Sequence, residues 1–178
     1  LAPGGQPELV RENSGRANGM TFDLHGRLII CEGNNRQVTR REPDGSYTPI
    51  AARLEGKRLN TPNDVVGRSD GSIYFTDPNG RLSPEERELD LSGIRRITPD
   101  GSFATVAEET GYPNGLAFSP DESILYVAIT RLDSRCIEAK ERGEVCRHQC
   151  IRAFDVAADG TLSNGRVFAD MFSAEDGV

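Results

Sequence analysis

Two adjoining segments decide the fold of this chain: Leu59-Asn60-Thr61-Pro62-Asn63-Asp64-Val65-Val66 and Ser69-Asp70-Gly71-Ser72-Ile73-Tyr74-Phe75-Thr76-Asp77-Pro78. A Pro-Asn-Asp turn opens a short apolar strand, and an Asp-Gly turn separates that strand from a second apolar run. Asp-Gly between two apolar runs is among the strongest short-range signals for a hairpin. The two segments therefore predict an antiparallel β-hairpin.

The same pattern occurs three times along the chain. Each copy begins with an Asn ahead of an apolar strand, at Asn18, Asn63 and Asn114, and ends near an Asp-Gly turn. Four short strands per unit, at a period of about 40 to 50 residues, are typical of β-propeller blades. We expect an all-β propeller of three to four blades in a single partial domain, 1–178. Its repeat units are predicted at about 18–60, 61–112 and 113–172.

Two further strands are predicted at the margins of these units. Glu8–Arg11 resembles the outer strand of a preceding blade, and Val167–Ala169 the outer strand of the third. Propellers typically have about 4 to 8 blades, and this chain begins at Leu1 rather than Met. We therefore expect part of a longer propeller, with a small β domain that stacks without closing as the alternative. The open blade edges predict self-association as one outcome.

Composition excludes some classes of partner. Only 36% of the residues are hydrophobic, Trp is absent, and 19 Gly and 10 Pro suit many short strands joined by turns. The net charge of −7 argues against nucleic acid or an anionic membrane as a partner. No apolar run approaches the roughly 20 residues that span a bilayer, and the start does not resemble a signal peptide. The compartment, cytoplasm or periplasm, stays open.

The cysteines and one polar loop allow several interpretations. A zinc site or a disulfide could form among Cys136, Cys146, Cys150 and His148. Free thiols are favoured, because structural zinc usually needs a second ligand pair at matching spacing. Cys31 follows an apolar run and is predicted to be buried. The loop at 78–88 could border a pocket, although its polar sequence favours a solvated surface turn.

Equivalent positions in successive blades should form a ring, because the innermost strands of a propeller begin around its axis. That ring would contain Asn18, Asn63, Asn114 and Asp176. Amide and carboxylate oxygens are the donors that Ca²⁺ prefers, and the set is too poor in His and Cys for zinc or copper. Asn also tolerates turn conformations, which is the favoured interpretation for Asn18. The Pro-Asn-Asp and Pro-Asn-Gly contexts favour Asn63 and Asn114 as ligands.

Three segments resemble the gluconolactonase, senescence-marker-protein and luciferin-regenerating-enzyme family. They are 56–66, which includes Pro62-Asn63-Asp64, then 69–78, and 113–122, which includes Pro113-Asn114-Gly115-Leu116-Ala117-Phe118. The resemblance implies a six-bladed propeller with one catalytic divalent metal, commonly Ca²⁺. It implies metal ligation by Asn63, Asn114, a Glu in an early Glu-Gly-Pro motif and a later Asp, here Asp176. No Glu-Gly-Pro occurs in this chain, so we expect the first metal carboxylate upstream of Leu1.

The expected reaction is the hydrolysis of a sugar lactone or related cyclic ester. The metal would polarise the carbonyl, and Asp176, or an Asp just beyond Val178, would accept a proton from the attacking water. Asp64 and Asn18 would support the site without binding the metal directly. Two alternatives stay open. One is a non-catalytic binding or scaffold propeller, favoured by the missing acidic ligand and the charged insertion at 131–149; the other is a phosphotriester or aryl-ester hydrolase.

Overall fold

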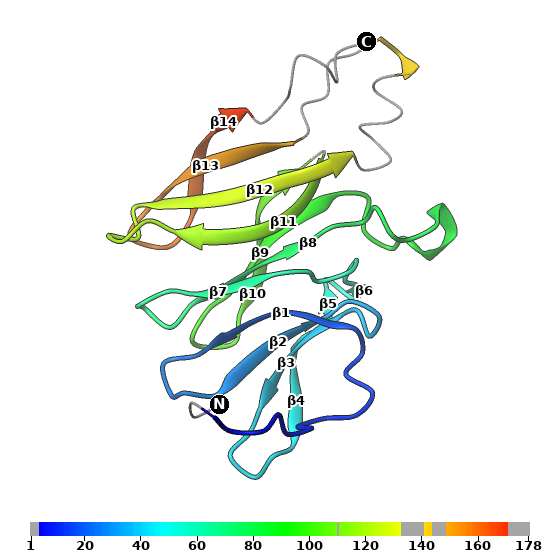
Figure 1. The fold of residues 1–178 in the computed structure, drawn as a ribbon. Coiled ribbons are helices and arrows are strands. Elements are labelled where there is room, and N and C mark those ends of the chain that lie inside the picture. Colours follow the sequence, from blue (N-terminus) through cyan, green and yellow to red (C-terminus); the bar gives the residue numbers. More distant parts are fainter. Residues whose placement is uncertain (1–3, 110, 133–140, 144–148, 171–178) are drawn as a thin grey trace.

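The structure is a computed structural model that describes residues 4–109, 111–132, 141–143 and 149–170. These residues form antiparallel strands joined by short turns, together with a 3-10 helix, η1 (Pro84–Glu86). No helix in the described ranges is long and apolar enough to cross a membrane. Figure 1 shows three sheets stacked in chain order, from the blue first sheet through the green second sheet to the yellow and red third.

The first sheet is a four-stranded meander in the order β1-β2-β3-β4. Its strands are β1 (Ala17–Phe22), β2 (Leu28–Glu32), β3 (Gln37–Arg41) and β4 (Tyr47–Ala51). Its last turn shows the chemistry that recurs along the chain: Asp44 accepts a hydrogen bond from the Ser46 N–H at 2.9 Å. Local bonds of this kind favour turns over continued strands.

The second sheet contains the hairpin that the sequence predicts. It follows a two-stranded hairpin of β5 (Arg53–Leu54) and β6 (Lys57–Arg58). Its four strands are β7 (Val65–Gly67), β8 (Ile73–Asp77), β9 (Ser92–Ile97) and β10 (Phe103–Glu109). Val65 pairs with Phe75 across β7 and β8. Gly71 closes their turn at φ +87°, a conformation that costs glycine little.

The third sheet repeats the meander in the order β11-β12-β13-β14. Its strands are β11 (Gly111–Phe118), β12 (Ile124–Leu132), β13 (Cys150–Val156) and β14 (Leu162–Asp170). The predicted strand at Val167–Ala169 is confirmed as part of β14, the outer strand. Three four-stranded antiparallel meanders confirm the prediction of an all-β fold built from propeller-type blades.

The core lies between successive sheets, and β8 shows how it is divided. All five residues of β8 are buried because a sheet packs on each of its faces. Ile73 and Phe75 join the cluster shared with the first sheet, whereas Tyr74 joins the cluster shared with the third. Side chains of a strand alternate between its two faces. Cys31 is buried in the first of these clusters, as predicted.

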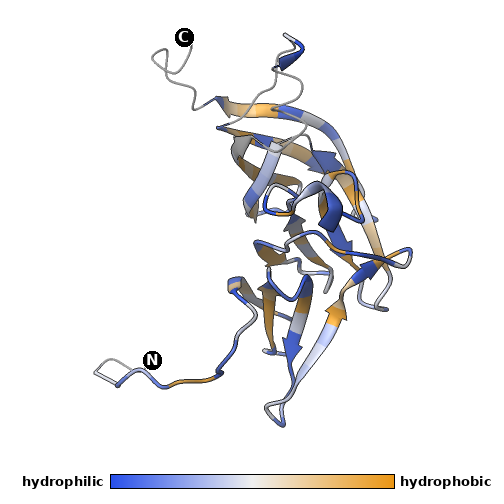
Figure 2. Cartoon of the chain, turned by 90° about the vertical axis from the view of Figure 1, so that its right-hand side faces the viewer, coloured by the Kyte–Doolittle hydropathy of each residue, from blue (hydrophilic) through white to orange (hydrophobic). Residues whose placement is uncertain are grey.

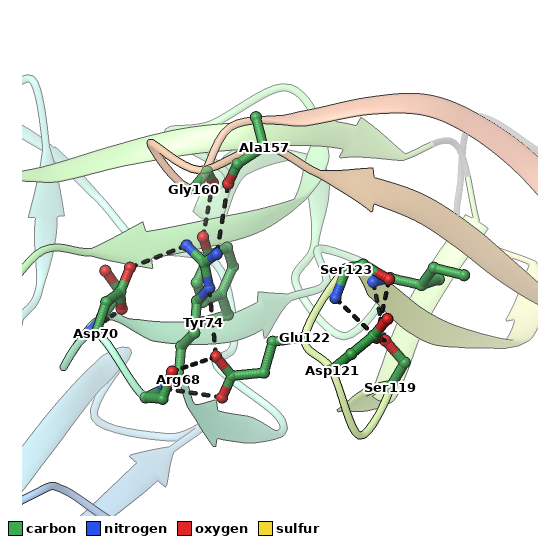
Figure 3. A network of polar contacts seen from close by, with 12 residues as sticks. Arg68, Asp70, Tyr74, Ser119, Asp121, Glu122, Ser123, Ala157 and Gly160 are labelled. Atoms are coloured by element: carbon green, nitrogen blue, oxygen red, sulfur yellow. Dashed lines mark hydrogen bonds and ion pairs between the residues drawn. The ribbon is translucent and has the colours of Figure 1, made fainter.

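A polar network links the second and third sheets at the turn end (Figure 3). The buried Tyr74 hydroxyl donates to the carbonyl of Gly160 at 2.6 Å. Arg68 donates to the carbonyl of Ala157 at 3.4 Å, and its Nε lies 3.7 Å from the Glu122 carboxylate. These contacts fix the β7–β8 turn against turns of the third sheet.

The prediction of a strand at Glu8–Arg11 is wrong. Among the described residues this segment pairs with no strand, and its Leu9 and Val10 are exposed. Figure 2 shows the N-terminal segment running away from the sheets. Arg11 instead forms an ion pair with the buried Glu32 and stacks on Tyr47, with 4.1 Å between guanidinium carbon and ring centroid. A strand needs a neighbouring backbone, and two apolar residues between charged ones do not supply one.

Large apolar side chains lie exposed on the first and third sheets. Met20 and Phe22 of β1 and Phe168 of β14 are each more than half exposed. They are the surfaces that blade-to-blade packing would cover in a propeller, and self-association through them stays a prediction.

Candidate metal centre and adjoining cleft

The three Asn residues occupy equivalent irregular positions at the starts of the innermost strands. The pairing of β1 with β2 shifts register between Ala17 and Met20, which places Asn18 in a bulge. The pairing of β11 with β12 shifts between Pro113 and Leu116, around Asn114. Asn63 lies two residues before β7, and its N–H donates to the Thr76 carbonyl at 2.9 Å. Bulges re-aim side chains away from the regular alternation of a strand.

Asp64 joins the starts of all three sheets. One carboxylate oxygen accepts from the N–H of Val65 at 2.9 Å, and the other accepts from the N–H of Leu116 at 3.3 Å. On the other side, the Gly19 N–H donates to the carbonyl of Asn63 at 2.8 Å. A Cβ on Gly19 would lie 2.1 Å from the Asp64 carboxylate, so only glycine fits there without displacement. The starts of the three inner strands thus lie together in the structure, whereas the predicted ring of Asn and Asp side chains stays a prediction.

The Asn63 side chain is the one whose surroundings fit metal binding best. It is 5% exposed, and its Oδ1 has no hydrogen-bond partner among the described residues. Asn114 is half-buried, and its Nδ2 donates to the Thr130 hydroxyl at 3.3 Å. Asn18 is exposed and lines the same cleft as Asn63. Asp176 lies outside the described residues, so its predicted role stays a prediction.

The donor set of the described residues fits a hard cation in part. Within these residues no three His, Cys, Asp or Glu side chains lie together as a metal cluster. A cation at this point would therefore rely on amide oxygens such as Asn63 Oδ1, which suit Ca²⁺ and do not suit zinc. Cys136, Cys146 and His148, proposed as zinc ligands or disulfide partners, lie outside the described residues.

A cleft of about 820 Å³ opens beside Asn63. It is formed by the β2–β3 turn, the connector from β6 to β7 and the loop between β8 and β9. The lining residues are Arg16, Ala17, Asn18, Gly33, Asn34, Arg36, Arg58, Thr61, Pro62, Asn63, Arg81, Leu82, Glu85, Glu86, Glu88 and Tyr112. The loop at 78–88 does border this cleft, because it leaves β8 at the same end of the sheets as Asn63. Residues 80–86 are also mostly exposed, so the loop is both a solvated turn and a wall of the cleft.

Buried polar contacts hold the connector that leads to Asn63. The Asn60 N–H donates to the Asp77 carboxylate at 3.1 Å, and the Thr61 hydroxyl donates to the Pro78 carbonyl at 2.6 Å. Burial raises the pKa of Asp77 to about 6, although the neighbouring Arg95 opposes this rise. Because these groups are fully enclosed, they fix the backbone that positions the candidate ligand.

The chain belongs to the SMP-30/Gluconolactonase/LRE-like family, whose sequence model matches residues 3–178. It is 32% identical over 136 residues to a gluconolactonase of Zymomonas mobilis, covering 72% of this chain and 38% of that protein. A solved gluconolactonase of Xanthomonas campestris superposes with a TM-score of 0.73 at 37% identity, over 90% of this chain and 51% of that one.

Virginiamycin B lyase of Staphylococcus aureus shares the fold alone, with a TM-score of 0.56 at 16% identity over 94% of this chain and 45% of that chain. The chain thus spans about half or less of the length of these relatives. The family resemblance seen in the sequence is confirmed, and it supports a lactone hydrolase at the level of the family.

The arginines of the cleft were missed from the sequence. Arg36 lies in the β2–β3 turn, Arg58 at the end of β6 and Arg81 in the β8–β9 loop. They are about 20 residues apart, and no motif joins them. The available signal was topological: in a meander, the β2–β3 turn, the β8–β9 loop and the approach to the next inner strand share one end of the sheets.

Proposed function

We propose that the protein to which this chain belongs hydrolyses a sugar lactone or a related cyclic ester with the help of Ca²⁺ or another divalent cation. Family membership supports the reaction class. The observation that carries the cation is the buried Asn63 Oδ1, which lacks a partner among the described residues. An unsatisfied buried acceptor costs about 1–3 kcal/mol, and a bound cation would remove that cost.

In this proposal the residues of the chain have separate tasks. Asn63 and Asn114 would hold the cation through their amide oxygens, and Asp64 would position both strand starts through its bonds to Val65 and Leu116. The cation, when bound, would supply Lewis-acid polarisation of the ester carbonyl. The proton acceptor for water is proposed as Asp176. Asn18, at the cleft wall, would limit how the ring approaches Asn63.

The test compares Asn63→Ala with Asn34→Ala. Asn34 is an exposed amide lining the same cleft, so its loss should leave cation binding unchanged. We expect Ca²⁺ to raise the melting temperature of the parent chain and of Asn34→Ala, because a ligand that binds only the folded state stabilises it. We expect no such rise in Asn63→Ala.

A second measurement addresses the reaction. Chelator should abolish lactone hydrolysis by the full-length protein, and Ca²⁺ should restore it. Equal Ca²⁺-dependent stabilisation of Asn63→Ala and the parent chain would exclude Asn63 as a ligand, and chelator-resistant hydrolysis would exclude the metal-dependent reaction.

A further inference from the structure

The cleft is rich in arginine although the chain as a whole is acidic. Four arginines line it, in a protein of net charge −7: Arg16, Arg36, Arg58 and Arg81. None of the four forms an ion pair with a carboxylate of the described residues, whereas nine other arginines of those residues do. The four arginines of the cleft are therefore not held in ion pairs, although three glutamates also line the cleft: Glu85, Glu86 and Glu88.

The glutamates of the cleft are engaged elsewhere. The Glu86 carboxylate accepts from the Ser83 N–H at 2.9 Å, which caps η1. The Glu88 carboxylate accepts from the backbone N–H of Arg58 at 2.8 Å and lies 3.8 Å from the Arg53 guanidinium, outside the cleft. Only Glu85 remains, and it is exposed. These carboxylates keep their charge but form no ion pair with a guanidinium of the cleft, so the terminal nitrogens of Arg58 and Arg81 keep donors for another anion.

Arg36 gives the cleft a fixed cationic wall. It is 7% exposed, its Nε donates to the Leu59 carbonyl at 2.5 Å, and its Nη1 donates to the Glu86 carbonyl at 2.9 Å. Its Nη2 has no partner among the described residues. Burial, together with the nearby positive charge of Arg58, lowers the pKa of Arg36, although the carboxylates of Glu88, Asp77 and Glu86 oppose this shift. The spare nitrogen Nη2 is itself buried, so Arg36 contributes a fixed positive charge beside the cleft rather than an exposed donor.

The side chains of the other arginines differ in how many contacts hold them. Arg58 is half-buried and makes no side-chain hydrogen bond among the described residues, whereas Arg81 donates from Nε to the Tyr112 hydroxyl at 3.0 Å and is otherwise exposed. Both can therefore turn their terminal nitrogens toward a ligand in the cleft. The volume of about 820 Å³ lies within the range of small-molecule sites, about 300–1,000 Å³.

We propose that this cleft binds the anionic end of the substrate, so that the preferred lactone carries a carboxylate or phosphate group in addition to its ring ester. The inference rests on the proposed function for the lactone end and on the arginines for the anionic end. Arg36 would form the fixed wall, and Arg58 and Arg81 would close on the oxyanion. A neutral lactone would leave these charges without a counterion.

The test measures the binding of three non-hydrolysable sugar acids to the chain by calorimetry in metal-free buffer. Gluconate carries one carboxylate, glucarate adds a second carboxylate, and 6-phosphogluconate adds a phosphate. We expect glucarate or 6-phosphogluconate to bind about tenfold more tightly than gluconate, since charge-assisted hydrogen bonds are the strong ones. The tighter of the two identifies the oxyanion. The preference should shrink at about 1 M NaCl, where the Debye length is only about 3 Å.

Variants separate the arginine site from general charge attraction. Arg58→Gln and Arg81→Gln should each lower affinity for the preferred acid about three- to tenfold, and should lower affinity for gluconate by a smaller factor. Arg41→Gln, at an exposed position at the end of β3 outside the cleft, should change neither. Equal affinity for all three acids would overturn the proposal, as would an Arg41→Gln effect as large as that of Arg58→Gln.

Hydrolysis of neutral gluconolactone by the full-length protein distinguishes the two proposals. Chelator-sensitive hydrolysis without an anion preference would overturn the anionic subsite alone. An anion preference that depends on Arg58, without lactone hydrolysis, would support the subsite and overturn the proposed reaction.

Discussion

The close approach of β1 to β7 at Gly19 makes this residue a sensitive point of the fold. In Gly19→Ala, the new methyl group would lie 2.1 Å from the Asp64 carboxylate, 2.5 Å from its Cα and 2.9 Å from the Asn63 carbonyl. Two of these atoms belong to the backbone and cannot rotate away. Overpacking of this kind costs about 1–3 kcal/mol, whereas the loss of glycine freedom in the unfolded chain returns about 0.4–1 kcal/mol. The 2.1 Å contact places the cost near the upper end of its range, so we expect a net loss of about 2 kcal/mol.

Gly33→Ala is the matched control. Gly33 borders the same cleft, but its nearest contact to an added Cβ, the Pro62 carbonyl, lies at an ordinary 3.6 Å. Thermal unfolding followed by circular dichroism should show Gly19→Ala melting about 4–8 °C below the parent chain, since 1 kcal/mol shifts a domain of this size by about 2–4 °C. Gly33→Ala should melt at or slightly above the parent temperature. If Gly19→Ala melts within a degree of Gly33→Ala, the close approach of β1 to Asp64 is wrong.

Three further outcomes are expected. Burial raises the pKa of Asp77 to about 6, compared with 3.8 for an exposed aspartate, because the folded chain favours the protonated carboxyl. The stability that this group contributes is therefore complete below about pH 4 and is lost as the pH rises through about 6. In urea unfolding measured across that pH range, the parent chain should lose about 3 kcal/mol of unfolding free energy through this group. Asp77→Asn should not show this loss, and an unchanged dependence of its stability on pH would contradict the prediction. Tyr74→Phe should cost about 1–3 kcal/mol by leaving the Gly160 carbonyl unpaired, whereas Tyr47→Phe, used as the control, should cost less. The Cys31 thiol, buried with a raised pKa, should resist iodoacetamide until urea unfolds the chain, as peptide mass spectrometry can show; labelling of the native protein would refute its burial.

The sheets were predictable because their turns are encoded locally. Asp44, Asp70, Asp100, Asp121 and Asp159 each accept a hydrogen bond from the backbone N–H two residues ahead. Such a bond depends only on neighbouring residues, so a sequence pattern can reveal it. The position of Asn63 before β7 was predictable for the same reason, since it follows from the hairpin.

Features that depend on distant neighbours were not predictable. Glu8–Arg11 has a strand-like sequence, but the sequence does not say whether a backbone lies beside it to accept its hydrogen bonds. The arginine cleft depends on which loops leave the sheets at one end, and on how the β8–β9 loop folds back. That Arg81 and Arg58 line the same cleft is decided by how these segments pack together, which leaves no periodic signal in the sequence.

Asp64 has a consequence for how such a protein can diverge. Its carboxylate and backbone contact the first, second and third sheets at once. A substitution of Asp64 changes contacts with three blades at once, whereas a substitution in a loop at the rim of the cleft changes contacts with only one or two neighbours. Selection for new substrates should therefore act on the rim of the cleft, around Arg58 and Arg81, while Asp64 stays unchanged.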